Sequence, residues 1–208
     1  MKLYELSVKE YGEKLKSSEP APGGGTASAF SGLQGAALIT MVAELTIGRE
    51  KYADFEPICQ AAAELGGKLL TRFAELTEED AQAYFAVADA FKLPKTTEEE
   101  KLRRSTAIRE ATMYATKVPF ETMTLGLQGI RMAAKLSGKS NPNAASDLGV
   151  AALCLNACVQ GAWFNVRINL PGLKDETVQN DFFEKGSAMR DEAELLCAEI
   201  SAVVQTLM

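Results

Sequence analysis

The sequence predicts an all-α protein, folded as a single-domain helical bundle of six or seven helices over residues 1–208. Apolar residues recur at helical spacing along most of the chain, and no segment shows the alternating pattern of a half-buried strand. The connections between helical segments are mostly short, which is typical of a bundle. With 208 residues, 47% of them hydrophobic, the chain can form one well-packed core. No internal repeat or linker divides it, so one domain is expected.

The first helix is expected at about residues 7–15, with Ser7 as its N-cap and Glu10 as the reciprocal capping partner. The loop KSSEPAPGGG ends this helix. A second helix is expected at about residues 26–47, and it is predicted to be central to the core because its small residues allow neighbouring helices to approach closely. These small residues are Ala29, Gly32, Ala36 and Ala43.

The remaining helices are expected at about residues 56–91, at residues 98–136 with Thr96 or Thr97 as cap, at residues 145–164 and at residues 176–207. Pro57 is tolerated in a first turn, and the pair Gly66 and Gly67 predicts a weak or kinked point. Pro119 is expected to bend or restart its helix. The stretch NVRINLPGLKD, before the last helix, is predicted to be extended.

The charge and the apolar pattern exclude some classes of protein. A net charge of -6 and the lack of a basic stripe argue against nucleic acid as a partner. The longest apolar run, residues 26–42, is interrupted by Ser, Thr, Gln and Gly, which favours a buried helix over a membrane span. The polar start MKLYELSVKE does not resemble a signal peptide, so a cytoplasmic protein without membrane partners is expected.

The chain contains four cysteines and no histidine. Serine or cysteine nucleophiles activated by histidine are therefore excluded, as are histidine metal sites. Proton transfer in any active site must be carried out by Asp, Glu, Lys, Tyr or Cys. The cysteines form no CxxC pair, so we expect buried free thiols and no metal site.

The first candidate site is the stretch PAPGGGTAS, from Pro20 to Ser28. Glycines followed by Thr26 and Ser28 at a helix start can present backbone N–H groups to an anion or a polar ring. The stretch is not a P-loop, because the GK[ST] ending is missing. A tight turn that packs against another helix explains the pattern equally well.

The second candidate comprises Asp80 and Asp89, with Lys95 just beyond the end of their helix. Asp80 precedes AQAYFAVA, so its carboxylate could be partly buried on an apolar helix face, with a raised pKa. The alternative is a solvated carboxylate that closes the acidic patch EED.

The third candidate is SNPNAASDLGVAA, in which Asn141, Asn143, Ser146 and Asp147 lie at the entrance of an apolar helix. Ser146 or Asp147 could equally be the N-cap of that helix.

The fourth candidate is NVRIN, with Asn165, Arg167 and Asn169. In an extended segment these three side chains would share one face and could hold a carboxylate or a polar heterocycle. A solvated loop is the alternative.

Six stretches, taken together and in this order, resemble the cyclodeaminase/cyclohydrolase family, which acts on one-carbon derivatives of tetrahydrofolate. The stretches are PAPGGGTASA, LTIGREKY, DAQAYFAVADAFKLPK, AIREAT with VPFE, SDLGVAA and GAWFNVRINL. The resemblance runs from about residue 5 to residue 175. The resemblance implies an all-helical homodimer that binds folate in a cleft near the glycine loop, with no cofactor beyond the tetrahydrofolate derivative itself.

On this resemblance, we hypothesise that Asp147 is the principal acid/base and Asp80 a second carboxylate or orienting group. Lys95 would tune their pKa values or contact the substrate. The residues expected to bind the substrate are Pro22, Gly23, Gly24, Gly25, Thr26, Ser28, Asn141, Ser146, Asn165, Arg167 and Asn169.

The resemblance leaves two reactions open. A formiminotetrahydrofolate cyclodeaminase releases ammonia and forms 5,10-methenyltetrahydrofolate, and a methenyltetrahydrofolate cyclohydrolase opens that ring with water. SDLGVAA and NVRINL slightly favour the cyclodeaminase. A non-catalytic folate-binding protein, or a homodimeric module with the small-residue helix as its interface, would not need Asp80 and Asp147 together in a cleft.

Overall fold

The computed structural model describes residues 2–208 and contains six α-helices. They are α1 (Val8–Leu15), α2 (Gly24–Glu44), α3 (Glu56–Lys92), α4 (Glu98–Leu136), α5 (Ala145–Asn169) and α6 (Glu176–Leu207). Four short 3-10 segments, Leu3–Glu5, Glu50–Phe55, Pro142–Ala144 and Leu170–Gly172, lie before α1 or between the later helices. No strand occurs in this part of the chain, so the all-α prediction is confirmed.

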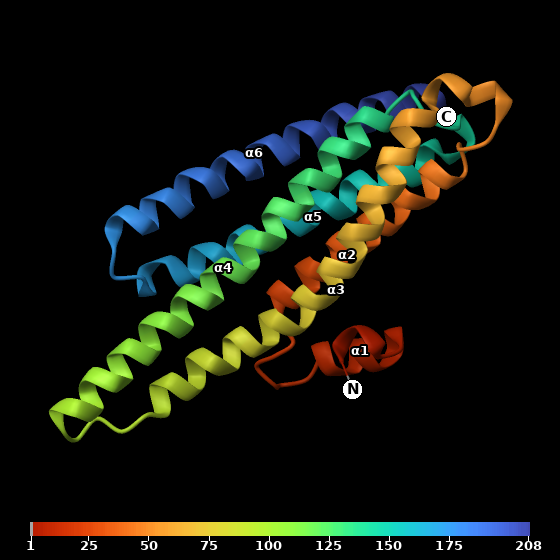
Figure 1. The fold of residues 1–208 in the computed structure, drawn as a ribbon. Helices are drawn as coiled ribbons and strands as arrows, with labels where there is room; N and C mark the ends of the chain where they lie inside the picture. Colours follow the sequence, from red (N-terminus) through yellow and green to blue (C-terminus); the bar gives the residue numbers. More distant parts are fainter. Residues whose placement is uncertain (1) are drawn as a thin grey trace.

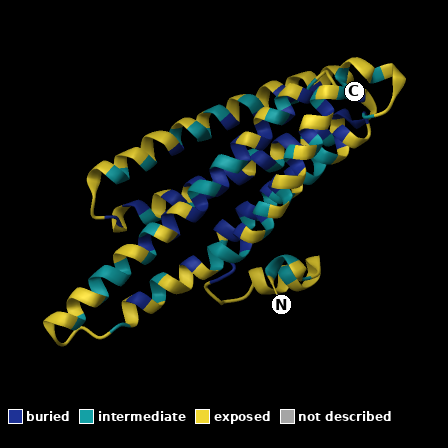
Figure 2. Ribbon diagram, in the orientation of Figure 1, coloured by how far each residue is buried: buried dark blue, intermediate teal, exposed yellow. Residues whose placement is uncertain are grey.

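Helices α2 to α6 lie alongside one another in an elongated bundle (Figure 1). The short α1 lies beside this bundle and contacts α2, where the ring centroids of Tyr11 and Phe30 are 4.3 Å apart. Helix α5 is central, because it packs against α2, α4 and α6, while α3 packs against α2 and α4. The connected ends of α3 and α4 project beyond the other helices at one end of the bundle (Figure 1). Buried residues concentrate on the sides where the long helices face one another (Figure 2).

The core depends on small residues placed opposite large ones. A Cβ at Gly32 would lie 2.5 Å from Phe73 Cζ, and one at Gly129 would lie 2.7 Å from Leu155 Cδ2. The ring of Trp163 lies similarly close to Gly186 of α6. Because these glycines carry no side chain, the helix axes can approach closely around the buried rings and leucines. The predicted role of α2 as a core helix is consistent with this packing.

The predictions for α3 and α4 were partly wrong. Helix α3 is continuous through Gly66 and Gly67. Gly66 is buried where α3 meets α2, and a Cβ there would lie 3.1 Å from the Ala36 carbonyl oxygen, so this glycine permits a close helix contact. Helix α4 likewise passes through the buried Pro119 without interruption. Tertiary packing on both sides of Pro119 offsets its local cost.

The prediction that NVRIN is extended was wrong. Helix α5 continues through this stretch to Asn169 and ends just before Pro171. Val166 and Leu170 are both buried, so the apolar face of α5 extends to the end of the stretch. Asn165 also donates to the Gly161 carbonyl at 2.8 Å, a bond within the helix. Burial of this face thus explains why the stretch is helical.

The N-caps predicted for α1 and α4 are present. Ser7 accepts from the Glu10 N–H in a capping box, and Thr97 forms the same arrangement with Glu100. At the start of α5, by contrast, the N-cap is Ala144, without a side-chain bond. Neither Ser146 nor Asp147 is therefore a cap.

Two helical spans would be long and apolar enough to cross a membrane by length and composition alone. They are Gly24–Glu44 and Pro142–Gly172, and half of each span's apolar window is buried inside the bundle. Core helices of soluble proteins have the same property, so the composition by itself does not distinguish the two cases.

Candidate active site

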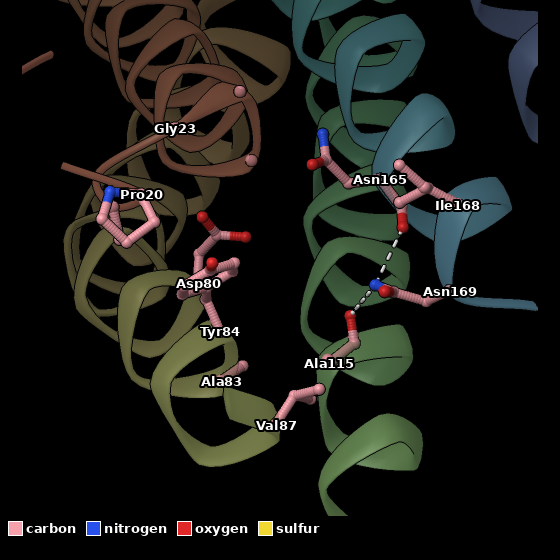
Figure 3. A pocket seen from close by; sticks show the side chains of 13 residues that line it. Pro20, Gly23, Asp80, Ala83, Tyr84, Val87, Ala115, Asn165, Ile168 and Asn169 are labelled. Atoms are coloured by element: carbon pink, nitrogen blue, oxygen red, sulfur yellow. Dashed lines mark hydrogen bonds between the residues drawn. The ribbon is translucent and has the colours of Figure 1, made fainter. Parts of the chain in front are cut away.

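A cavity of about 330 Å³ lies between the start of α2, the middle of α3 and the end of α5. Figure 3 shows α2 and α3 on one side of this cavity and α4 and α5 on the other. The lining residues are Pro20, Ala21, Gly23, Gly24, Gly25, Asp80, Ala83, Tyr84, Val87, Ala115, Asn165, Ile168 and Asn169. Asp80 is the one charged side chain among them, so the cavity combines apolar walls with a single carboxylate.

Asp80 lies on α3 and points into the cavity (Figure 3). Thr26 of α2 donates its hydroxyl proton to Asp80 Oδ2 at 2.9 Å. Burial raises the pKa of Asp80, and hydrogen bonds from the Thr26 hydroxyl and backbone N–H oppose this only in part. The raised pKa makes this carboxyl group a better proton acceptor than an exposed aspartate, as an acid/base group requires.

The glycine loop allows Asp80 to occupy its position. A Cβ at Gly25 would lie 2.6 Å from Asp80 Cγ and would overlap the carboxylate. Asp80 is thus packed directly against the backbone of residue 25, where only glycine leaves room for the carboxylate. Gly23 and Gly24 continue the loop and leave bare backbone as one wall of the cavity.

Asn165 and Asn169 lie one turn apart on α5 and share the face that lines the cavity. Asn169 Nδ2 donates to the Ala115 carbonyl at 2.8 Å and to the Asn165 carbonyl at 3.0 Å (Figure 3). Asn165 Nδ2 donates to the Gly161 carbonyl at 2.8 Å. Because both amide nitrogens bond backbone carbonyls, the two amide oxygens can accept from donors of a ligand.

Several lining residues were not found from the sequence. Tyr84 and Val87 lie one and two turns after Asp80 on α3, and Ile168 precedes Asn169 on α5. Tyr84 and Val87 could have been predicted from the sequence, because residues four and seven positions after Asp80 lie on the same face of a helix. No comparable signal marks Ala115 of α4, which reaches the cavity through tertiary packing.

Three predicted binding residues support the cavity from behind and do not line it. Thr26 is buried and holds Asp80. Ser28 is buried, donates to the Gly24 carbonyl at 2.7 Å and lies against Gly161 of α5. Pro22 is also buried, next to the cavity-lining Ala21.

The structure does not bring Asp147 and Ser146 to this cavity within one chain. Asp147 lies in the first turn of α5, eighteen residues before Asn165, which corresponds to about 27 Å along the helix. Lys95 is exposed in the loop between α3 and α4, at the projecting end of the bundle. A cleft that contains both aspartates of one chain, as hypothesised, is therefore absent from residues 2–208.

Asn141 is likewise remote from the cavity, and its polar atoms are engaged in the fold. Its N–H donates to Thr46 Oγ1 at 2.9 Å, and its Nδ2 donates to the Leu45 carbonyl at 3.2 Å. Its oxygen accepts from Tyr52 and from the Asn143 N–H. Asn141 therefore fastens the end of α2 to the start of α5.

Arg167 is also absent from the cavity lining. It is exposed on a different side of α5 from Asn165 and Asn169, because two residues correspond to more than half a turn of helix. The predicted three-residue face is therefore reduced to the two asparagines.

Comparison with known proteins gives a consistent result. Residues 7–187 match the model of the family described as formiminotransferase-cyclodeaminase. The chain is 36% identical over 200 residues to a methenyltetrahydrofolate cyclohydrolase of Methylorubrum extorquens, covering 96% of each protein. It is 31% identical over 196 residues to the formimidoyltransferase-cyclodeaminase of Mus musculus. The match covers 94% of this chain and about a third, 36%, of the mouse protein.

The fold is also similar to a solved structure. The crystal structure of a formiminotetrahydrofolate cyclodeaminase from Thermotoga maritima superimposes with a TM-score of 0.81 and 27% sequence identity. The match covers 99% of this chain and 97% of the other.

Proposed function

The chain belongs to the formiminotransferase-cyclodeaminase family, and from this premise we propose that it is an enzyme acting on one-carbon derivatives of tetrahydrofolate. The reaction proposed first is that of a formiminotetrahydrofolate cyclodeaminase. Folate N10 attacks the formimino carbon and forms a C–N bond, N10 loses its proton, and the C–N bond to the amino group then breaks. Ammonia leaves, and 5,10-methenyltetrahydrofolate remains.

The observation that carries this proposal is the single carboxylate in the cavity. Protonated formimino and methenyl groups are both amidinium cations, and Asp80 is the one charged side chain that lines the cavity. A carboxylate opposite the amidinium carbon stabilises its positive charge. Because burial raises its pKa, Asp80 can also accept the N10 proton and deliver a proton to the departing amino group.

The other cavity walls suit a flat, polar ring. Gly23 and Gly24 offer backbone without side chains, against which a pterin can lie. The oxygens of Asn165 and Asn169 can accept from the amino and ring N–H groups of the pterin. Tyr84 supplies an aromatic face. On this proposal the reaction needs no cofactor, since bond making and breaking require only proton transfers.

The second candidate is a methenyltetrahydrofolate cyclohydrolase, favoured by the 36% identity to a full-length protein of that name. In that reaction water adds to the amidinium carbon and loses a proton to the carboxylate. The bond to N5 then breaks as N5 gains a proton, which gives 10-formyltetrahydrofolate. Asp80 would serve both reactions, because each passes through a tetrahedral carbon that carries a nitrogen leaving group.

Two absorbance assays on one preparation test the proposal. Formation of the methenyl chromophore from 5-formiminotetrahydrofolate measures the cyclodeaminase, and loss of that chromophore on hydrolysis measures the cyclohydrolase. We expect Asp80→Asn to reduce the active reaction by roughly 10²-fold or more. Absence of both reactions in the unmodified protein, or full activity in Asp80→Asn, would contradict the proposal.

We further propose that the protein functions as a cytoplasmic homodimer that does not bind nucleic acid or membranes. The net charge of -6 opposes association with polyanions. A dimer is supported by the exposed apolar residues on α2 and α5, the same helices whose composition resembles that of membrane spans. Association of these faces would remove that surface from water.

A further inference from the structure

The short helix α1 packs against the bundle through one aromatic side chain. Among its residues, Val8–Leu15, Tyr11 is the one that is not exposed. Its ring lies against Phe30 of α2, with the ring centroids 4.3 Å apart. The position of α1 on the bundle therefore depends on Tyr11.

The Tyr11 hydroxyl group is buried and has no hydrogen-bond partner among residues 2–208. Such a group costs free energy, because it has given up its bonds to water without replacing them. A phenylalanine would pack on Phe30 equally well and without this cost. The ring thus explains the contact between α1 and α2, and the hydroxyl group needs a separate explanation.

Two contacts hold the N-terminal segment that contains α1 over the junction of α2 and α3. On α2, Phe30 lies one turn after Thr26, whose hydroxyl donates to Asp80 Oδ2 at 2.9 Å. Before α1, the Leu3 N–H donates to the carboxylate of Glu78, two residues before Asp80 on α3. The N-terminal segment therefore crosses from α2 to α3 at the level of the bond between Thr26 and Asp80.

The Asp80 carboxylate is the charged group that acts on the Tyr11 hydroxyl. Burial raises the pKa of Tyr11, and the negative charge of Asp80 raises it further. The phenol is therefore a neutral hydrogen-bond donor in the physiological range. Asp80 receives one side-chain hydrogen bond from the described residues, that of Thr26 to Oδ2, so its carboxylate can accept a second donor.

The other elements around Asp80 supply no charge that would stabilise its ionised form. Across the cavity, α4 and α5 present apolar and amide side chains, none of which titrates, and Tyr84 is the one other titratable residue in the cavity lining. Glu79, the neighbour of Asp80 on α3, is paired with Arg72. The donors within reach of the carboxylate are therefore neutral, namely Thr26 of α2 and the phenol of α1.

We propose that Tyr11 is a positioning residue for Asp80: its buried hydroxyl donates a hydrogen bond to the ionised carboxylate, which holds the carboxylate in place and favours its charged form. The inference rests on the acid/base role proposed above for Asp80 and names a residue that acts through it. A helix with a single packed side chain can shift enough to form this bond, because few contacts oppose the movement. The hydroxyl then gains the acceptor that it lacks.

Substitution of Tyr11 by phenylalanine tests the bond, because it removes the hydroxyl and keeps the ring on Phe30. A donor to the charged form lowers the pKa of a carboxyl group, so its loss should raise the pKa of Asp80 by about 0.5–1. NMR titration of the aspartate carboxyl carbons measures this pKa without substrate, and the signal that is absent from Asp80→Asn identifies the residue. Tyr4→Phe is the matched control and should leave this pKa unchanged, because the Tyr4 hydroxyl accepts from Lys2 Nζ at the surface.

The pH profile of kcat/KM for the active folate reaction gives a second readout. Tyr11→Phe should lower kcat/KM about three- to tenfold below the pKa of Asp80 and leave it nearly unchanged well above, since the variant alters the ionised fraction. Its Tm should be equal to or higher than that of the unmodified protein, because a buried hydroxyl without a partner is removed.

An unaltered pKa of Asp80 in Tyr11→Phe would overturn the inference, and so would a loss of activity that is equal at every pH. A lower Tm with an unchanged pH profile would assign Tyr11 a purely structural role and would overturn it as well. An unmodified protein without either folate reaction would overturn the proposed function instead, and the NMR titration would still decide whether Tyr11 bonds Asp80.

Discussion

The carboxylate of Asp80 occupies the space that a side chain at residue 25 would need. A methyl group on Gly25 would lie 2.6 Å from Asp80 Cγ and 2.8 Å from its Oδ2, closer than real Cβ contacts allow. The contact between Gly25 of α2 and Asp80 of α3 therefore fixes the position of the carboxylate and requires glycine at residue 25.

Substitution of Gly25 by alanine should displace the carboxylate and lower kcat/KM by roughly 10²-fold, since a catalytic group moved by about 1 Å loses that much. Gly12→Ala on α1 is the matched control, because a Cβ there would meet no atom within 4 Å and Gly12 does not line the cavity. Steady-state kinetics with the active folate substrate provide the measurement. Equal activity in the two variants would contradict the role given to Gly25.

Replacement of Asp80 by asparagine should stabilise the protein in a pH-dependent manner. Burial raises the pKa of Asp80 in the folded state above its ordinary value of 3.8, so the folded protein holds this proton more tightly than the unfolded chain. The favourable contribution is complete below the unfolded pKa and is lost as the pH rises through the folded pKa.

Asparagine does not titrate, so the Tm advantage of Asp80→Asn should grow as the pH is raised from about 4 to 8. We expect about 2–4 °C at the upper end. Differential scanning calorimetry across this range gives the measurement. An advantage that is constant or that shrinks with rising pH contradicts the assignment of desolvation as the main cause.

The adjacent Gly66 and Gly67 should respond to alanine in opposite directions. A Cβ at Gly66 would meet Thr40 Oγ1 and the Ala36 carbonyl oxygen of α2, whereas one at Gly67 would enter open space. Gly66→Ala should therefore cost about 1–3 kcal/mol of unfolding free energy. Gly67→Ala should add about 0.5–1 kcal/mol, because alanine has the higher helix propensity. Urea denaturation of the two variants under identical conditions measures both changes in unfolding free energy, and changes of the same sign would contradict the prediction.

Local patterns in the sequence predicted the start of α2 and the position of Asp80. The glycine loop and the helix face that follows Asp80 are both short-range signals, readable from residues a few positions apart. The bundle followed from helical periodicity in the same way.

Features set by packing could not be predicted. Alternating polar residues in NVRIN suggested an extended segment, yet burial of Val166 and Leu170 made it helical and turned Arg167 away from the asparagines. Asp147 seemed to belong beside Asp80 because sequence motifs carry no distances. The length of α5, a global quantity, separates the two groups within one chain.

The burial of Trp163 gives the protein an internal optical reporter. It is the one tryptophan in the chain, only 2% exposed, and its ring lies 5.6 Å from that of Phe183 of α6. Its fluorescence thus arises from a dry environment at the junction of α5 and α6, two residues before Asn165. A red shift of the emission would register the separation of these helices, and smaller changes in intensity would register events at the cavity end of α5 without any attached dye.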